Sequence, residues 1–224
     1  MTSPRLIVRA AAAGLALLVA GGALALAPAA PASAAGVTTH AWMAAEAIDQ
    51  VTSPQLKALL KANKEYVRAG AHFPDSGYAL SNTYGEEAHW QRFHDAYADQ
   101  ILTHTECTNL AATNGPCAKM IAFLMGMIGH GMGDEVWDWL FEPNVADLGE
   151  YYTPDSLGGQ ANEGGAELQM DLVAIADFGQ PTSNIVAFPG HSDILAAFES
   201  VGMDDITEDQ LNLGQAAMGV VHQV

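Results

Sequence analysis

Apolar and polar side chains alternate along most of this chain with a period of three to four residues, the period of an amphipathic α-helix. The pattern predicts helices over His40–Val51, Pro54–Val67, Glu86–Thr103, Ala118–Leu140, Glu163–Ala176, Ile194–Ser200 and Asp209–Val221. Pro and Gly interrupt the pattern at Ala71–Asn82, Glu142–Gly159 and Phe178–Pro189, which we expect to be loops or turns. Because the sequence shows no useful alternating strand pattern, internal repeat or linker, it predicts a single all-α domain.

Two helix starts carry local signals. Thr38 and Thr39 precede the first predicted helix and are typical N-cap residues. Ser53 precedes Pro54, and proline is favoured at the first position of a helix.

One predicted helix is unusual, because charged groups interrupt a strongly apolar stretch. The stretch from Phe123 to Phe141 reads FLMGMIGHGMGDEVWDWLF, with His130, Asp134 and Asp138 at every fourth residue. This spacing places the three groups on one helix face, each about 40° further round than the last. Burying them is costly unless they are paired, and a metal ion is a common partner. The alternative is a polar stripe that faces solvent.

The first residues predict a secretory signal peptide, residues 1–35. Arg5 and Arg9 form a basic start, Ala10–Ala27 is apolar, and Pro28–Ala35 contains small residues suited to cleavage. We therefore expect a secreted, extracellular protein whose mature domain is 36–224, although an uncleaved membrane anchor is the alternative. In that compartment Cys107 and Cys117, the only cysteines, are expected to form a disulfide.

The charge of the chain is strongly acidic. Without Arg5 and Arg9 the chain keeps six Lys and Arg against 26 Asp and Glu, and no Lys or Arg follows Lys119. Such a surface repels nucleic acid, so stable nucleic-acid binding is not expected. The second half of the chain contains no arginine, so a phosphate group bound there would have to be neutralised by other cations. A solubility adaptation is the alternative explanation of the charge, but it does not account for the helical spacing of the acids.

Further candidate ligands lie in apolar or constrained contexts. His40 begins a helix, Asp75 lies in the turn GAHFPDSGY, and His89 precedes Trp90. Glu167 and Asp171 continue a second four-residue spacing that starts at Glu163. Each alone is more often a structural residue than a ligand. His72, His94 and His104 are expected at the surface or in loops.

Taken in order, these motifs resemble the zinc-dependent phospholipase C family, and more closely the catalytic domain of glycosylphosphatidylinositol-specific phospholipase D. The pieces that carry the resemblance are GVTTHAWMAAEAI, YVRAGAHFPDSGY, EEAHWQRFHDAY and AFLMGMIGHGMGDEVWDWL. They follow the family's order and span most of Gly36 to Val173.

The resemblance implies an all-α bundle that holds two or three zinc ions (Zn²⁺). It implies metal ligands at His40, Asp75, His89, His130 and Asp134, with Asp75 also orienting or deprotonating the attacking water. The sequence departs from the family at Asp138, where the family has His, and at Glu167-x-x-x-Asp171, where it has His followed by an acid. We predict that these three carboxylates are ligands as well, and such hard ligands allow other divalent cations at their positions.

The sequence therefore predicts a metal-dependent phosphodiesterase whose substrate is a phospholipid or another lipid-linked phosphodiester, with transient contact to a membrane surface. Three alternatives stay open: a metal-binding domain that has lost catalysis, a related metal-dependent nuclease, and a metal-free bundle.

Overall fold

The computed structural model describes residues 36–78, 83–109, 111–137, 170–180 and 187–221. The chain divides into two units, Met1–Ala30 and Pro31–Val224, and all of the described residues belong to the second. The predicted signal peptide, residues 1–35, lies outside the described residues, as do Asp138 and Glu167.

The described part of the chain is helical and contains no strand, which confirms the all-α prediction. Its helices are α2 (Val37–Ala47), η1 (Ile48–Gln50), α3 (Pro54–Ala62), α4 (Lys64–Ser76), α5 (Gly85–Ala88), α6 (Gln91–Thr103), η3 (Thr105–Thr108), α7 (Pro116–Val136), α10 (His191–Ser200) and α11 (Glu208–Val221). Within the described residues, 170–176 are also helical. None of the helices described is long and apolar enough to cross a bilayer.

Several helix boundaries differ from the predicted ones. The first helix begins at Val37 with Gly36 as its N-cap, so Thr38 and Thr39, predicted as cap residues, lie inside it. The helix expected over Pro54–Val67 breaks at Asn63, whose side-chain amide donates to the carbonyls of Leu59 and Thr113 at 2.9 and 2.8 Å. The next helix, α4, then continues through Pro74 to Ser76, where the sequence predicted a loop.

The helix expected over Glu86–Thr103 is also divided, into α5 and α6. Trp90, between them, has the extended backbone of an N-terminal flanking residue, with φ −98° and ψ 149°. By contrast, the predicted start of α3 is confirmed, since the Ser53 hydroxyl accepts a hydrogen bond from the Leu56 amide at 3.3 Å.

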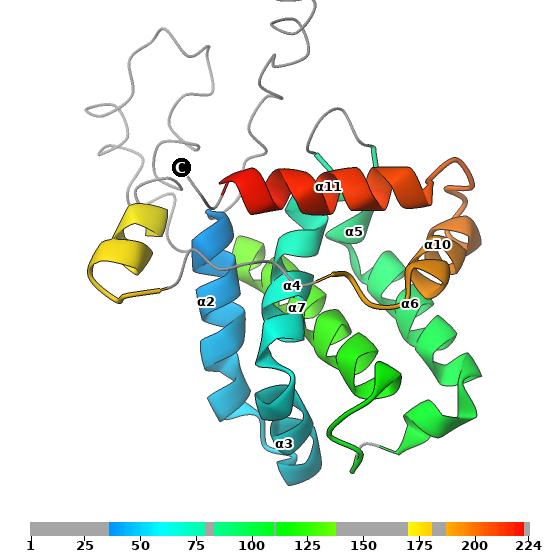
Figure 1. Ribbon diagram of the computed structural model, residues 1–224, viewed down its shortest axis with the longest axis horizontal. Helices are drawn as coiled ribbons and strands as arrows, with labels where there is room; N and C mark the ends of the chain where they lie inside the picture. Colours follow the sequence, from blue (N-terminus) through cyan, green and yellow to red (C-terminus); the bar gives the residue numbers. More distant parts are fainter. Residues whose placement is uncertain (1–35, 79–82, 110, 138–169, 181–186, 222–224) are drawn as a thin grey trace, which may run out of the picture. The chain divides into compact units, whose positions relative to one another are not determined.

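The core forms where α4 crosses its neighbours. Figure 1 shows α4 beside α7 and α2, with α11 running across its C-terminal end, and α4 packs against all three. Phe73 of α4 is fully buried, and the rings of Tyr84, Phe123 and Phe188 lie 5.2–5.3 Å from its ring. Burial of these rings stabilises the end of α4 and therefore fixes the position of Asp75, two residues further along.

The predicted disulfide is present. Cys107 and Cys117 are bonded, and their Cα atoms lie 5.0 Å apart. The bond joins η3 to the first turn of α7, and Cys107 is part of the core.

Candidate metal centre

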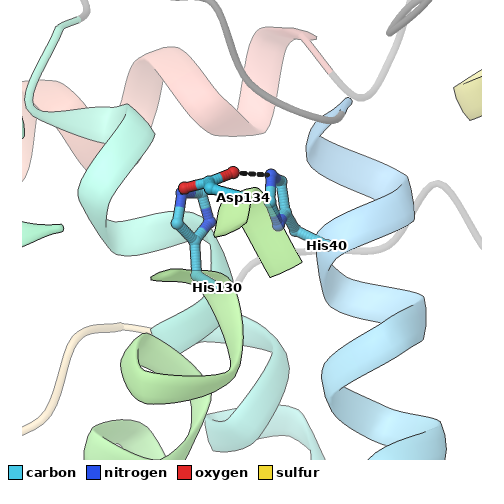
Figure 2. A group of neighbouring side chains, drawn as sticks. All are labelled: His40, His130 and Asp134. Atoms are coloured by element: carbon cyan, nitrogen blue, oxygen red, sulfur yellow. Dashed lines mark ion pairs between the residues drawn. The ribbon is translucent and has the colours of Figure 1, made fainter. Parts of the chain in front are cut away.

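Five of the eight predicted ligands come together in two groups that share one imidazole. His40, His130 and Asp134 form one group, and Asp75, His89 and His130 form the other. Within each group the ligand atoms lie within 4.8 Å of one another. Figure 2 shows His40 of α2 reaching across to Asp134 and His130 of α7.

Four helical elements supply these side chains. His40 lies in the first turn of α2, Asp75 in the last turn of α4, and His89 directly after α5. His130 and Asp134 lie one turn apart near the end of α7, as their spacing predicted. The centre is thus assembled from residues up to 94 positions apart in the chain, which only the packing of the helices brings together.

Backbone carbonyls fix the protonation of two imidazoles. His130 Nδ1 lies 2.7 Å from the carbonyl oxygen of Ala71, and His89 Nδ1 lies 2.7 Å from that of Gly85. A carbonyl oxygen can only accept, so each Nδ1 carries a hydrogen and, in the neutral ring, each Nε2 presents a lone pair.

These two lone pairs face each other. His89 Nε2 lies 3.0 Å from His130 Nε2. Asp134 Oδ2 lies 3.2 Å from His130 Nε2 and 3.7 Å from His89 Nε2. Two acceptor nitrogens cannot hydrogen-bond to each other, so a proton or a cation between them is needed. Imidazoles oriented through Nδ1 with Nε2 converging are typical of metal sites.

The remaining groups are buried without hydrogen-bond partners. Within the described residues, the one close partner of the His40 ring nitrogens is Asp134, whose Oδ1 lies 3.1 Å from Nε2 in an ion pair without good hydrogen-bond geometry. Asp75 Oδ1 and Asp134 Oδ1 are also buried and without a hydrogen bond. The His40 ring stacks on His130, with ring centroids 3.8 Å apart. Unpaired buried polar atoms are costly, and a divalent cation would satisfy them. The residues present therefore fit the metal that the sequence implies.

The electrostatics of the centre favour charged carboxylates. Burial acts to raise the pKa of Asp75, but the nearby imidazoles of His130, His89 and His40 lower it below its usual value. Burial opposes ionisation of Asp134 as well, but its close contacts with the His130 and His40 imidazoles lower its pKa.

The pKa values of His40 and His130 shift in opposite directions. Burial, with the neighbouring His130, lowers the pKa of His40. Burial also acts to lower the pKa of His130, but Asp75 and Asp134 raise it above its usual value. Two anionic carboxylates beside these converging imidazoles make a site that attracts a cation.

One predicted ligand lies elsewhere. Asp171 accepts hydrogen bonds from the Thr38 and Thr39 amides at 3.1 and 2.8 Å, and it is in neither ligand group. Asp138 and Glu167 lie outside the described residues, so their role as ligands stays a prediction.

Some features were not foreseen. His72 and His94, expected at the surface, are buried. The carbonyls that orient His89 and His130 belong to Gly85 and Ala71, and no side-chain pattern marks a backbone acceptor. Tyr78 was not predicted to lie near the site, but its ring lies 5.4 Å from that of His89. Its position three residues after the predicted ligand Asp75 was the only signal in the sequence.

Comparison with known proteins agrees with this geometry. The model of the zinc-dependent phospholipase C family matches residues 39–137, a range that contains all five clustered residues and ends before Asp138. No curated protein and no solved structure matches the chain. The family match, together with the two His/Asp groups, supports a metal-dependent phospholipid hydrolase and zinc as its metal. The closer likeness to glycosylphosphatidylinositol-specific phospholipase D stays a prediction.

Proposed function

We propose that this chain is a secreted phosphodiesterase that hydrolyses a phospholipid or another lipid-linked phosphodiester with the help of two or three divalent cations. The observation that carries the proposal is the convergence of His89 Nε2 and His130 Nε2, 3.0 Å apart, with the carboxylates of Asp75 and Asp134. Secretion is supported by the apolar leader of the sequence and by the disulfide.

His130 Nε2 has a single lone pair and would bind one cation, either with His40 and Asp134 or with Asp75 and His89. The remaining residues of the other group would hold a second cation. When bound, such ions act as Lewis acids toward a phosphoryl oxygen and lower the pKa of water toward about 7. No Lys or Arg follows Lys119, so the last 105 residues of the chain offer neither to neutralise a phosphodiester. Cations held by these residues would supply that positive charge.

The chain's own residues orient the reaction. Asp75 is buried, the nearby imidazoles lower its pKa, and its Oδ1 has no hydrogen-bond partner among the described residues, so it can accept a hydrogen from the attacking water. The Ala71 and Gly85 carbonyls keep the His130 and His89 rings in one tautomer, which prevents either Nε2 from carrying the hydrogen in the neutral state.

The test combines metal content with product analysis. The mature protein is loaded with Zn²⁺ and freed of excess ion, its metal content is measured by elemental analysis, and it is incubated with phosphatidylcholine vesicles. We expect at least two ions per chain and release of headgroup. Phosphorylated headgroup with diacylglycerol indicates cleavage of the C type, and phosphatidic acid indicates the D type.

Two substitutions and one control connect the activity to the site. His130→Ala removes the shared ligand, and Asp134→Asn removes charge at constant shape; each should lower turnover at least a hundredfold. His191→Ala is the matched control, because its ring is only partly buried and belongs to neither ligand group. Full activity in either site variant would overturn the assignment. Metal binding without turnover on phospholipid or single-stranded nucleic acid would favour a domain that has lost catalysis, and turnover on nucleic acid alone would favour a nuclease.

A further inference from the structure

We infer that Asp171 is a positioning residue that caps α2 from a distant part of the chain and thereby holds His40 in the metal centre. Its bearing on the metal rests on the proposed function, whereas its action on α2 does not. The resemblance instead places a metal ligand at this position, so the two roles make different predictions.

Both carboxylate oxygens of Asp171 are occupied by the first turn of α2. Oδ1 accepts from the Thr39 amide at 2.8 Å and from the Thr39 hydroxyl at 2.8 Å. Oδ2 accepts from the Thr38 amide at 3.1 Å. The first amides of a helix have no partner within the helix, and a negative charge beside them is favourable. Asp171 meets both needs from 132 residues away.

The residue at the usual capping position cannot do this. Gly36 occupies that position, and no side chain there makes a capping hydrogen bond. A Cβ on Gly36 would collide with the Asp171 carboxylate, with Oδ2 only 2.7 Å away. The glycine therefore leaves the space that Asp171 fills, and the identities of the two positions depend on each other.

The turn that Asp171 holds is the turn that carries His40. The His40 amide donates to the carbonyl of Gly36 at 3.0 Å, which closes that turn. His40 is 1% exposed, and its imidazole stacks on His130. Fraying of the first turn would displace His40, whereas Asp75 and His89 belong to other helices. Loss of the cap should therefore weaken one ligand group and spare the other.

A second contact holds the same segment on α2. The ring of Phe178 lies 4.5 Å from that of Trp42, one turn or less beyond His40. Residues 170–178 thus contact α2 before and after His40 in the sequence. The Asp171 carboxylate binds the N-terminus of α2, and the Phe178 ring packs on Trp42.

Amide hydrogen exchange of the metal-free protein, followed by NMR, tests the cap directly. Asp171→Ala should speed exchange of the Thr38, Thr39 and His40 amides roughly five- to tenfold. Asp171→Asn, which keeps the shape and one acceptor oxygen, should have a smaller effect and serves if the alanine variant does not fold. Asp177→Ala is the matched control, since it removes an exposed carboxylate from the same segment. Unchanged exchange at Thr38 and Thr39 in both Asp171 variants would overturn the inference.

Gly36→Ser distinguishes a cap from a metal ligand. In the wild type the substitution should lower the melting temperature, because the carboxylate occupies the space. In the Asp171→Ala background that space is free, and the new hydroxyl can accept from the same amides. In the double variant, slow exchange of the Thr38 and Thr39 amides and the affinity for metal should then return together. The opposite result would overturn the positioning role. Asp171→Ala would then lose metal without faster amide exchange in α2, Gly36→Ser would not restore the metal, and Asp171 would be a direct ligand.

A Co²⁺ titration followed by visible absorption gives the metal readout. We expect Asp171→Ala to weaken one binding step about tenfold and leave the other unchanged. If the wild type binds no divalent cation, the proposed function fails, and the exchange experiment still decides whether Asp171 caps α2. Equal weakening of both steps in Asp171→Ala would contradict selective positioning of His40.

Discussion

The backbones of Gly70 of α4 and Gly126 of α7 are in direct contact, so that neither position has room for a Cβ atom. A Cβ on Gly126 would lie 2.9 Å from the Gly70 Cα and would collide with the carbonyl oxygen of Val67. A Cβ on Gly70 would in turn collide with the carbonyl of Phe123. This backbone-to-backbone contact brings the Ala71 carbonyl within 2.7 Å of His130 Nδ1. The metal centre therefore depends on two residues that do not belong to it.

Gly126→Ala should destabilise the protein and weaken its metal binding. The added methyl group must push α4 away from α7, and overpacking of this kind typically costs about 1–3 kcal/mol of unfolding free energy. The measurement is urea unfolding together with a zinc titration. Gly219→Ala is the control, because a Cβ there meets nothing within 4 Å and alanine is the better helix former in α11. A Gly126→Ala variant as stable as Gly219→Ala would show that the contact is looser than the structure has it.

Removal of metal should lower the melting temperature. The ligand groups leave buried nitrogen and oxygen atoms without hydrogen bonds, and a bound cation stabilises the folded state by about 2.7 kcal/mol at a hundredfold excess over its Kd. Thermal unfolding with Zn²⁺ and with chelator gives the difference. His130→Ala, which removes a ligand from both groups, should reduce it strongly. An equal shift in wild type and His130→Ala would mean that the ion binds elsewhere.

Much of the centre follows from sequence periodicity, because spacing along a helix determines which side chains share a face. The four-residue interval between His130 and Asp134 was enough to place both on one side of α7. The order of motifs then indicated Asp75, His89 and His40 as their companions, and the structure brings these three together with them.

The rest depends on contacts that no local pattern encodes. Proline normally disfavours a helix interior, so the sequence predicted a loop at Pro74, yet burial of Phe73 keeps α4 helical to Ser76. Asp171 shares the four-residue spacing of a ligand face, but its carboxylate is used by amides 132 residues away. Periodicity indicates which face of a helix carries the polar groups. It does not indicate which residues of other helices pack against that face.

Reduction of the disulfide should destabilise the protein. The bond closes a loop between residues 10 positions apart and should contribute roughly 2–3 kcal/mol to the free energy of unfolding. Urea unfolding with and without a phosphine reductant measures this. A double variant, Cys107→Ser with Cys117→Ser, should already be destabilised and should not respond to the reductant. If reductant lowers the stability of both proteins equally, the effect does not come from this bond.

The ion pair of His104 with Asp193 should make stability depend on pH. His104 Nε2 donates to Asp193 Oδ1 at 2.8 Å and links the end of α6 to the first turn of α10. The hydrogen bond and charge of Asp193 raise the pKa of His104 above its usual value of 6.5. A raised pKa in the folded state means that the pair stabilises fully below the pKa of the unfolded chain. That contribution is lost as the pH rises through the higher folded value.

Asp193→Asn should therefore lower the melting temperature relative to wild type at pH 5.5, and the difference should shrink above pH 8. NMR titration of the His104 ring should show its pKa falling toward 6.5 in the variant. Asp177→Asn removes an equal charge from an exposed position in another segment and should leave the His104 pKa unchanged. A difference in melting temperature that stays constant from pH 5.5 to pH 8 would show that Asp193 stabilises the fold through its packing or its neutral hydrogen bond. The charge of His104 would then contribute nothing to the connection between α6 and α10.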